Sequence, residues 1–317
     1  MYNMDDKEIS LSICVSAYNH ERYIDECMES ILSQQTDFIY EIIVGNDCST
    51  DATEEVLKKY ENRAQIINRK ENLGLCANMY DLFLRARGKY VFDMAGDDYL
   101  YDSHVLQKLY DFIENHDEYH SVSAWHCFYS EQEGKMRDLF DEKTPQEYTL
   151  YDFLKSGNGL VIYGLVRNTF YAERDINAYL AQGARNNEEI KWYFYILSKG
   201  KKYILQENIY VYRYVARADG SNYNSTHSTL DVFKDYYSDV KMMQKKFGDK
   251  YNFNPLLLKK CNQYCVKLSD SFYNIRQFLK VMSFEDTMRL LWYKCYLKLH
   301  HYQDPPKWDK PDYYERH

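Results

Sequence analysis

The first hundred residues alternate between short apolar runs and segments in which apolar residues recur at helical spacing. Alternation of this kind favours buried parallel strands joined by right-handed helical crossovers. The predicted strands are residues 11–17, 40–45, 64–68 and 90–94. The predicted helices are residues 24–32, 51–60 and 75–86. We therefore predict an α/β fold in which helices flank a mainly parallel sheet.

Beyond residue 120 the pattern becomes less regular, and the last part of the chain is helical throughout. The predicted strands in this part are residues 121–129, 159–166, 202–205 and 209–215, and the predicted helix is 188–198. Residues 228–302 show only helical patterns. A chain of 317 residues can form one large domain with an appendage. We expect a main domain over residues 1–225 and a C-terminal helical region over 226–317.

The charge balance restricts the classes of partner. Forty Lys and Arg residues stand against 48 Asp and Glu residues, which gives a net charge of -8. A general nucleic-acid binder needs a surplus of positive charge to meet phosphates, so we expect no nucleic-acid partner. An acidic chain that binds a phosphorylated ligand must concentrate positive charge locally or use a metal cation.

Neither cysteine spacing nor hydropathy indicates a secreted or membrane-spanning protein. The eight cysteines form no paired CxxC motif, which argues against structural zinc and a disulfide framework. The first residues lack a secretory signal, and no apolar run approaches the roughly 20 residues of a membrane span. We therefore expect a reduced, cytoplasmic setting.

The segment 288–302 (MRLLWYKCYLKLHHY) combines apolar and aromatic residues with basic ones. An amphipathic helix of this composition can lie on the anionic inner face of a cell membrane. The alternative, which we favour slightly, is that its apolar face packs on the main domain or on a second subunit. Peripheral membrane contact through the C-terminal helices is therefore one of two expectations.

Polar residues follow each of the predicted strands, where a parallel sheet places its ligands. The P-loop, dinucleotide-loop, serine-hydrolase and zincin motifs are all absent from the sequence. For Asp51, a helix cap is the better interpretation than a ligand contact. The other polar residues near the strand ends include Tyr18, Asn19, Asn46, Asp47, Ser49, Asn72, Asn78, Asp97 and Asp98. Because the fold brings these ends together, we predict a ligand site there.

Four segments also occur in the order and spacing of one known family. They are SICVSAYNHERYIDECMESILSQ, EIIVGNDCSTDAT, ENLGLCAN and GKYVFDMAGDDYL. Asn72 and Asn78 fit the pattern NxGxxxN, and the later segment NNEEIKWYFYILSKGKKYILQENIYVYR places acidic residues before a helix, a glycine and a final Tyr-Arg. Together, over about residues 9–222, these segments resemble the family 2 glycosyltransferases, which have the GT-A fold.

This resemblance implies an inverting, hexosyltransferase-type reaction that uses a nucleotide-sugar donor and a divalent metal, Mn²⁺ or Mg²⁺. It favours UDP as the nucleotide ahead of dTDP and GDP, and a glycan or lipid-linked saccharide as the acceptor in polysaccharide assembly. In this sequence, Asp98 and Asp97 match the metal motif, and Glu189 matches the general base, with Glu188 as the fallback. The matching donor-nucleotide positions are Ala17, Tyr18, Asn19, Asp47, Asn72, Asn78 and Asp97.

Chemical reasoning adds candidates of its own. A carboxylate-held metal would offset the diphosphate charge, and a second carboxylate would take the proton of the acceptor hydroxyl. Arg213 or Arg217 could pair with the diphosphate, although two surface arginines are an equally good interpretation.

Three positions depart from the family pattern. Ala95 replaces the common first aspartate of the metal motif, Glu189 replaces a more usual aspartate, and Val215 replaces a frequent histidine. Two alternative functions therefore remain open. One is an inactive relative that binds nucleotide sugars or acts as a scaffold, and the other is a sugar nucleotidyltransferase, although the glycine-rich basic loop of that class is missing.

Overall fold

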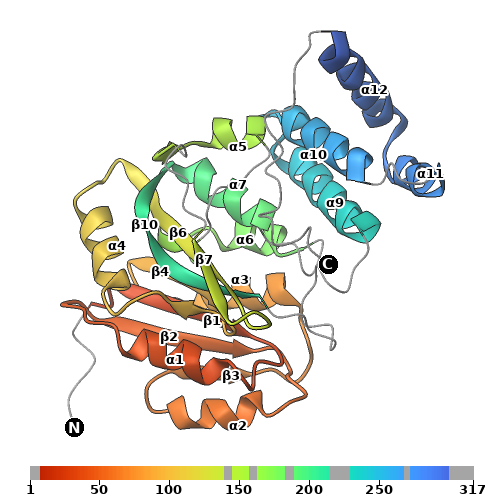
Figure 1. Ribbon diagram of the computed structural model, residues 1–317. Helices are drawn as coiled ribbons and strands as arrows, with labels where there is room; N and C mark the ends of the chain where they lie inside the picture. The colour runs from red at the N-terminus through yellow and green to blue at the C-terminus, as the bar shows by residue number, and fades with distance from the viewer. Residues whose placement is uncertain are drawn as a thin grey trace.

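A computed structural model describes residues 8–138, 145–156, 163–182, 189–214, 229–267 and 272–299 (Figure 1). The strands are β1 (Leu11–Ala17), β2 (Tyr40–Asn46), β3 (Gln65–Asn68), β4 (Tyr90–Ala95), β5 (Tyr99–Leu100), β6 (Tyr119–Ser130), β7 (Lys135–Asp138), β8 (Glu147–Tyr148), β9 (Gly164–Arg167) and β10 (Lys201–Tyr214). The helices up to β10 are α1 (Ile24–Leu32), α2 (Thr53–Leu57), α3 (Leu75–Arg85), α4 (Val105–Glu114), α5 (Leu150–Ser156), α6 (Arg174–Leu180) and α7 (Glu189–Lys199). The helices after β10 are α9 (Thr229–Phe247), α10 (Asn254–Lys267), α11 (Phe272–Val281) and α12 (Phe284–Leu299).

One central sheet organises these elements, with strand order β3-β2-β1-β4-β9-β6-β10-β5. The neighbouring strands β3, β2, β1 and β4 are parallel, as the alternating sequence pattern predicts. β9 lies antiparallel between β4 and β6, and β10 runs parallel to β6. The carboxyl ends of β1, β2, β4, β6 and β10 therefore share one edge of the sheet.

The sequence predicts separate strands at 202–205 and 209–215, whereas the structure has one long strand, β10. Its register against β6 shifts between Leu205 and Asn208 and again between Asn208 and Tyr210. The polar residues at this irregularity interrupt the apolar pattern without ending the hydrogen-bonded ladder. The long strand carries Arg213 to the same edge as the ends of β1 and β4.

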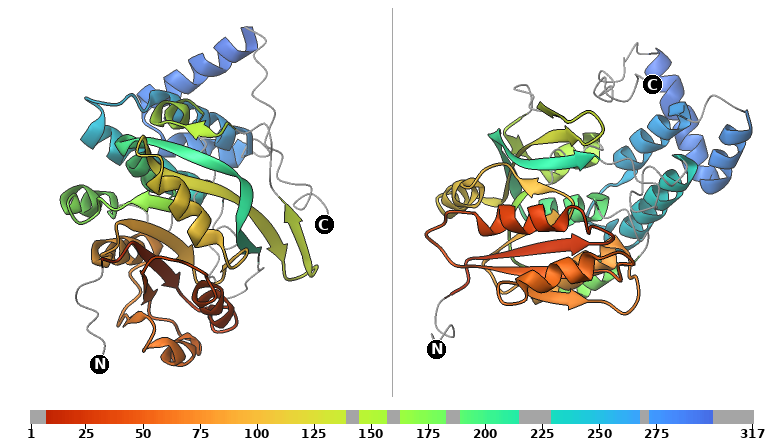
Figure 2. Two further views of the ribbon diagram at one scale, coloured as in Figure 1. Left: turned by 90° about the vertical axis from the view of Figure 1, so that its left-hand side faces the viewer. Right: turned by 60° about the horizontal axis from the view of Figure 1, so that its bottom comes forward.

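Two hydrophobic clusters cover the two faces of the sheet. One cluster packs α1, α2 and α4 against the inward side chains of β1 and β4. The other joins α3, α5, α6 and α7 to the helices that follow β10, including α9 and α10. In Figure 2, the helices after β10 lie to one side of the sheet, beside α7 and away from β3. In the described ranges after residue 228, all regular structure is helical, as predicted.

Candidate functional site

The loops that follow β1 and β2 are held to each other by side-chain hydrogen bonds. The Asn19 backbone adopts the left-handed conformation with φ 57°, a region that Asn tolerates better than most residues. Its Oδ1 accepts a hydrogen bond from the Thr50 backbone N–H at 2.8 Å, and its own N–H donates to Ser49 Oγ at 3.0 Å. Asn19 therefore fixes the shape of this edge from within the protein.

Asp47 joins the end of β2 to the segment that precedes α3. Its two carboxylate oxygens accept hydrogen bonds from the backbone N–H groups of Leu73, at 2.8 Å, and Gly74, at 2.9 Å. Asn72 Nδ2 donates to the Asp47 carbonyl at 3.2 Å. Gly74 has φ 84°, which favours glycine at this turn. The carboxylate is almost fully buried, so its first role is to hold this turn in place.

Asn78 lies inside the protein, in the second turn of α3. Its Nδ2 donates to the Gly45 carbonyl at 2.9 Å, and its Oδ1 accepts from Arg69 Nε at 3.0 Å. A Cβ at position 45 would lie 2.4 Å from Asn78 Oδ1, so β2 needs glycine there. Asn78 thus ties α3 to β2 below the site edge.

Asp97 follows β4 and keeps a partly accessible carboxylate, with 21% of its side chain exposed. Its Oδ1 lies 3.7 Å from Nε2 of His20, which comes from the loop after β1. Between them, a Cβ on Gly96 would come within 2.9 Å of His20 Nδ1, so only glycine allows this approach. Asp97 therefore faces the loop after β1, as the shared strand edge predicts.

Asp98 is the neighbouring residue, yet it is enclosed and only 2% exposed. Its Oδ1 accepts a hydrogen bond from the Arg213 backbone N–H at 2.7 Å, and its Oδ2 accepts from the Tyr210 hydroxyl at 2.9 Å. Burial and the nearby Asp97 carboxylate raise the pKa of Asp98 well above its ordinary value. These contacts fasten the end of β4 to β10.

Arg213 is buried, which contradicts its interpretation as a surface arginine. Its Nε donates to the Asp97 carbonyl at 2.9 Å, and its guanidinium forms ion pairs with Glu26 and Glu131. Three aromatic rings surround the guanidinium, at 5.0 to 5.4 Å from their centroids: Tyr23, Tyr99 and Tyr129. Arg213 is therefore an internal link beneath the site and not a surface arginine.

The remaining predicted residues divide into two groups. Ala17 ends β1, where its carbonyl accepts the Asp47 N–H at 2.8 Å, and Tyr18 follows it with a partly exposed side chain. Glu189 is the first residue of α7, and its side chain lies outside the described set. Glu188 and Arg217 also lie outside the described residues.

The oxygen donors at the shared edge of the sheet indicate which residues could hold a metal ion. Among the described residues, no three His, Cys, Asp or Glu side chains gather into a metal cluster. Asp97 has the properties of a ligand for Mg²⁺ or Mn²⁺, because it is a partly accessible carboxylate at the strand edge. Asp98 is less accessible to a cation than Asp97, because both of its oxygens accept protein hydrogen bonds and only 2% of the residue is exposed.

Two residues near the site have no counterpart in the sequence analysis. His20 approaches Asp97, and only its place in the loop SAYNHERY could have drawn attention to it. Asp93 lies on β4 and lines a small cavity with Trp192 of α7. Burial raises the pKa of Asp93 to about 7. An aspartate in the apolar run YVFDM is the signal that could have identified it.

A family model and several curated proteins match this chain. Residues 12–167 match the model of Glycosyl transferase family 2. An uncharacterized protein of Mycobacterium tuberculosis is 37% identical over 112 residues, which make up 34% of this chain and 32% of that protein. The chain therefore aligns with about a third of the length of that relative. TuaG of Bacillus subtilis, named for teichuronic acid biosynthesis, is 26% identical over 231 residues, or 71% of this chain and 87% of TuaG.

A solved structure shares the fold. The crystal structure of Staphylococcus aureus TarS in complex with UDP-GlcNAc superposes with a TM-score of 0.64 at 18% identity, over 86% of this chain and 79% of that one. In sequence, TarS, a protein named poly(ribitol-phosphate) beta-N-acetylglucosaminyltransferase, is 26% identical to this chain over 249 residues. Structural similarity at this identity establishes the predicted α/β fold of the GT-A type.

Proposed function

Because this chain belongs to the family 2 glycosyltransferases, we propose that it transfers a sugar from a UDP-sugar to an acceptor hydroxyl during polysaccharide assembly. The proposed reaction inverts the configuration at the anomeric carbon. TarS with bound UDP-GlcNAc and the naming of TuaG for teichuronic acid biosynthesis support this class of donor and product. The proposed acceptor is a surface glycan or a lipid-linked saccharide.

The observation that carries this proposal is the shared edge of the sheet. The loops after β1 and β2 are fastened together by Asn19 and Asp47, and β4 ends beside them in a partly accessible carboxylate, Asp97. Fixed backbone loops beside an exposed carboxylate form a preorganised place for a nucleotide and its phosphates. The matched family segment contains this whole arrangement.

Contact with the donor nucleotide is assigned to Ala17, Tyr18 and Asp47. A carboxylate has about four lone-pair positions, so Asp47 can accept one more hydrogen bond, from a base N–H, beside those from Leu73 and Gly74. Asn19, Asn72 and Asn78 are assigned an indirect role, because their side-chain hydrogen bonds hold the surrounding loops. A buried Arg213 supports Asp97 through its carbonyl and is not assigned to the diphosphate.

We assign the divalent metal, Mn²⁺ or Mg²⁺, to Asp97. When bound, such a cation stabilises the negative charge that develops on the departing diphosphate. Asp98 keeps β4 joined to β10 and so holds the backbone of Asp97 in place. The family resemblance matches Asp98 to the metal motif as well, and that match stays a prediction.

The general base is assigned to Glu189, with Glu188 as the alternative. An acceptor hydroxyl is a weak nucleophile until a carboxylate accepts its proton, and such a base contributes roughly 10²–10⁴-fold to turnover. Glu189 opens α7, and Trp192 in the same first turn stacks on Phe83 of α3 at 4.5 Å between ring centroids. Phe83 lies in the last turn of α3, so this contact packs the start of α7 against the end of α3.

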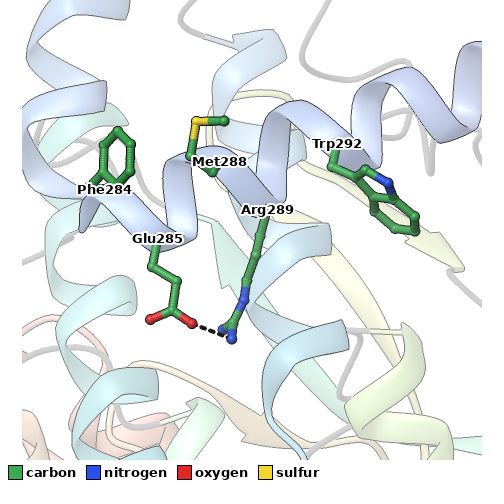
Figure 3. Close-up of a pocket in the computed structure, with 5 residues that line it drawn as sticks. All are labelled: Phe284, Glu285, Met288, Arg289 and Trp292. Carbon is green, nitrogen blue, oxygen red and sulfur yellow. Dashed lines mark ion pairs between the residues drawn. The ribbon is translucent and has the colours of Figure 1, made fainter.

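Peripheral membrane contact is proposed for the exposed face of α12. Phe284 and Trp292 are 82% and 67% exposed, and Met288 lies between them (Figure 3). Glu285 and Arg289 form an ion pair beside this apolar face. Aromatic and apolar side chains on one face of a helix suit the lipid headgroup boundary. No helix in the described ranges is long and apolar enough to cross a bilayer.

A panel of nucleotide sugars tests the proposed function. The purified chain is incubated with Mn²⁺ and UDP-GlcNAc, UDP-glucose, dTDP-glucose or GDP-mannose, and release of the nucleoside diphosphate is measured. We expect UDP release from at least one UDP-sugar, together with thermal stabilisation by UDP. Binding without release would indicate an inactive relative, and pyrophosphate formation from UTP and a sugar phosphate would indicate a nucleotidyltransferase.

A further inference from the structure

A fully buried ion pair connects α7 to the helices that follow β10. Nζ of Lys191 lies 3.5 Å from Oδ2 of Asp239 on α9, and both side chains are 0% exposed. The same ammonium donates a hydrogen bond to the carbonyl of Gln182 at 3.2 Å. Buried lysine and aspartate are rare unless they are paired, so this contact requires an explanation.

The position of Lys191 along the chain indicates what the pair holds. Lys191 lies two residues after Glu189, in the first turn of α7. Gln182 is the last described residue before the segment 183–188, which connects α6 to α7. One ammonium group therefore joins the residue before this segment, the first turn after it and a helix from the C-terminal region.

Stability alone does not account for such a pair. Removing both charges in favour of well-packed apolar residues is often neutral or stabilising, whereas removing one partner alone is strongly destabilising. The surroundings are already apolar, since Ile190 and Trp192 on α7 and Val240 on α9 belong to one buried cluster. Apolar side chains would not reproduce the fixed position of the ammonium, which donates a hydrogen bond to the Gln182 carbonyl and forms an ion pair with Asp239.

We propose that Lys191 and Asp239 are positioning residues for the acceptor side of the site. They hold the first turn of α7, and with it the proposed base Glu189, at a fixed place relative to the sheet edge. This inference rests on the proposed glycosyltransferase function. On this proposal, α9 contributes to the activity of the main domain and is not a separable appendage.

The test uses Lys191→Met, Asp239→Leu and the double variant in the full-length chain. Each single variant removes one charge of a buried pair and keeps the other, so we expect a lowered Tm in both. In the double variant we expect Tm to recover and the Kd for UDP to stay unchanged. The rate of UDP release should fall about ten- to a hundredfold, measured with UDP-GlcNAc or with the donor that the panel selects. Hydrogen exchange should become faster over residues 189–193.

Asp286→Asn is the matched control. Asp286 is also buried, and it accepts hydrogen bonds from the Tyr237 hydroxyl at 2.6 Å and from Lys241 Nζ at 3.0 Å, which links α12 to α9 without contacting α7. We expect this variant to lose stability and to keep its UDP release rate at temperatures where it is folded. A similar loss of turnover in the control would show that general loosening, and not the position of α7, limits the reaction.

Full recovery of both Tm and UDP release in the double variant would overturn the positioning role. If the double variant does not fold, Lys191→Arg retains the charge with displaced donor atoms and should show the same lowered turnover with unchanged UDP affinity. Absence of UDP release in the unmodified chain would instead count against the proposed function. In that case hydrogen exchange alone decides, and unchanged exchange over residues 189–193 would contradict the inference.

Discussion

Asp97 and Asp98 are adjacent carboxylates with opposite environments. Asp97 is partly accessible beside His20, whereas Asp98 is closed in by Tyr210 and Arg213. A motif read from the sequence treats the two as equivalent oxygen donors. Their contacts separate a residue that can meet a metal from a residue that holds two strands together.

Paired alanine substitutions test this separation. Asp97→Ala should abolish the Mn²⁺-dependent part of UDP binding and lower Tm less than Asp98→Ala does, because the Asp97 side chain is 21% exposed and Asp98 is only 2% exposed. Asp98→Ala should lower the free energy of unfolding by about 1–3 kcal/mol, because the Arg213 N–H and the Tyr210 hydroxyl lose a buried acceptor. Calorimetric titration of UDP with and without Mn²⁺, and urea unfolding, measure the two effects. A stable Asp98→Ala protein that loses only its metal response would reverse our assignment.

Asp93 gives the protein a pH-dependent stability. Burial raises its pKa to about 7, so the folded state favours the protonated acid. The stabilising contribution is complete below the unfolded pKa near 4, and it is lost as the pH rises through 7. Asp93→Asn removes this dependence. The free energy of unfolding of the variant relative to the natural chain should rise by about 2–3 kcal/mol between pH 5 and pH 8, as measured by urea unfolding. An equal difference at both pH values would contradict the raised pKa.

At the scale of elements, the sequence predicts the first half of the sheet closely. β1 has the predicted bounds, and β2, β4 and α3 agree within one residue. Their apolar periodicity is strong because each is buried against the sheet or its covering helices. β10 is different, because its continuity depends on pairing with β6 across a polar irregularity. Local sequence has no information on such pairing.

In the candidate site too, some features follow from local sequence and others depend on contacts between distant parts of the chain. The sequence places Asn19, Asp47 and Asp97 at strand ends, and the structure brings those ends to one edge. The roles of Asp98 and Arg213 could not be predicted, because their partners lie more than a hundred residues away in the chain. Polarity identifies a residue that needs a partner, but only tertiary structure identifies the partner.

The exposed face of α12 allows a test of peripheral membrane contact. Phe284→Ser, Met288→Ser and Trp292→Ser together remove its exposed apolar groups while leaving the buried Leu290 in place. We expect the triple variant to lose co-sedimentation with phosphatidylglycerol vesicles. Tyr151→Ser with Tyr171→Ser, two other exposed aromatic positions, is the control and should sediment like the natural chain. The triple variant could instead bind vesicles unchanged but no longer form a dimer in sedimentation velocity. That result would identify a second subunit as the partner of this face.

At the scale of the whole molecule, the described helices after β10 share a hydrophobic cluster with the sheet. Phe194 of α7 contacts Phe247 of α9 and Phe253 beside α10, with ring centroids 5.1 and 5.2 Å apart. Burial of aromatic rings of this size contributes several kcal/mol to stability. The expected boundary near residue 225 therefore marks a change in the sequence pattern, but one hydrophobic core extends across it.

The hydrogen bond between Asp98 and the Arg213 N–H spans 115 positions of the chain. A ribosome that adds about 5–20 residues per second completes that interval in roughly 6–23 s. During this time β1 to β4 have already been made, but the end of β4 lacks the strand to which it is fastened. The end of β4 therefore lacks its partner strand in the nascent chain until β10 leaves the exit tunnel.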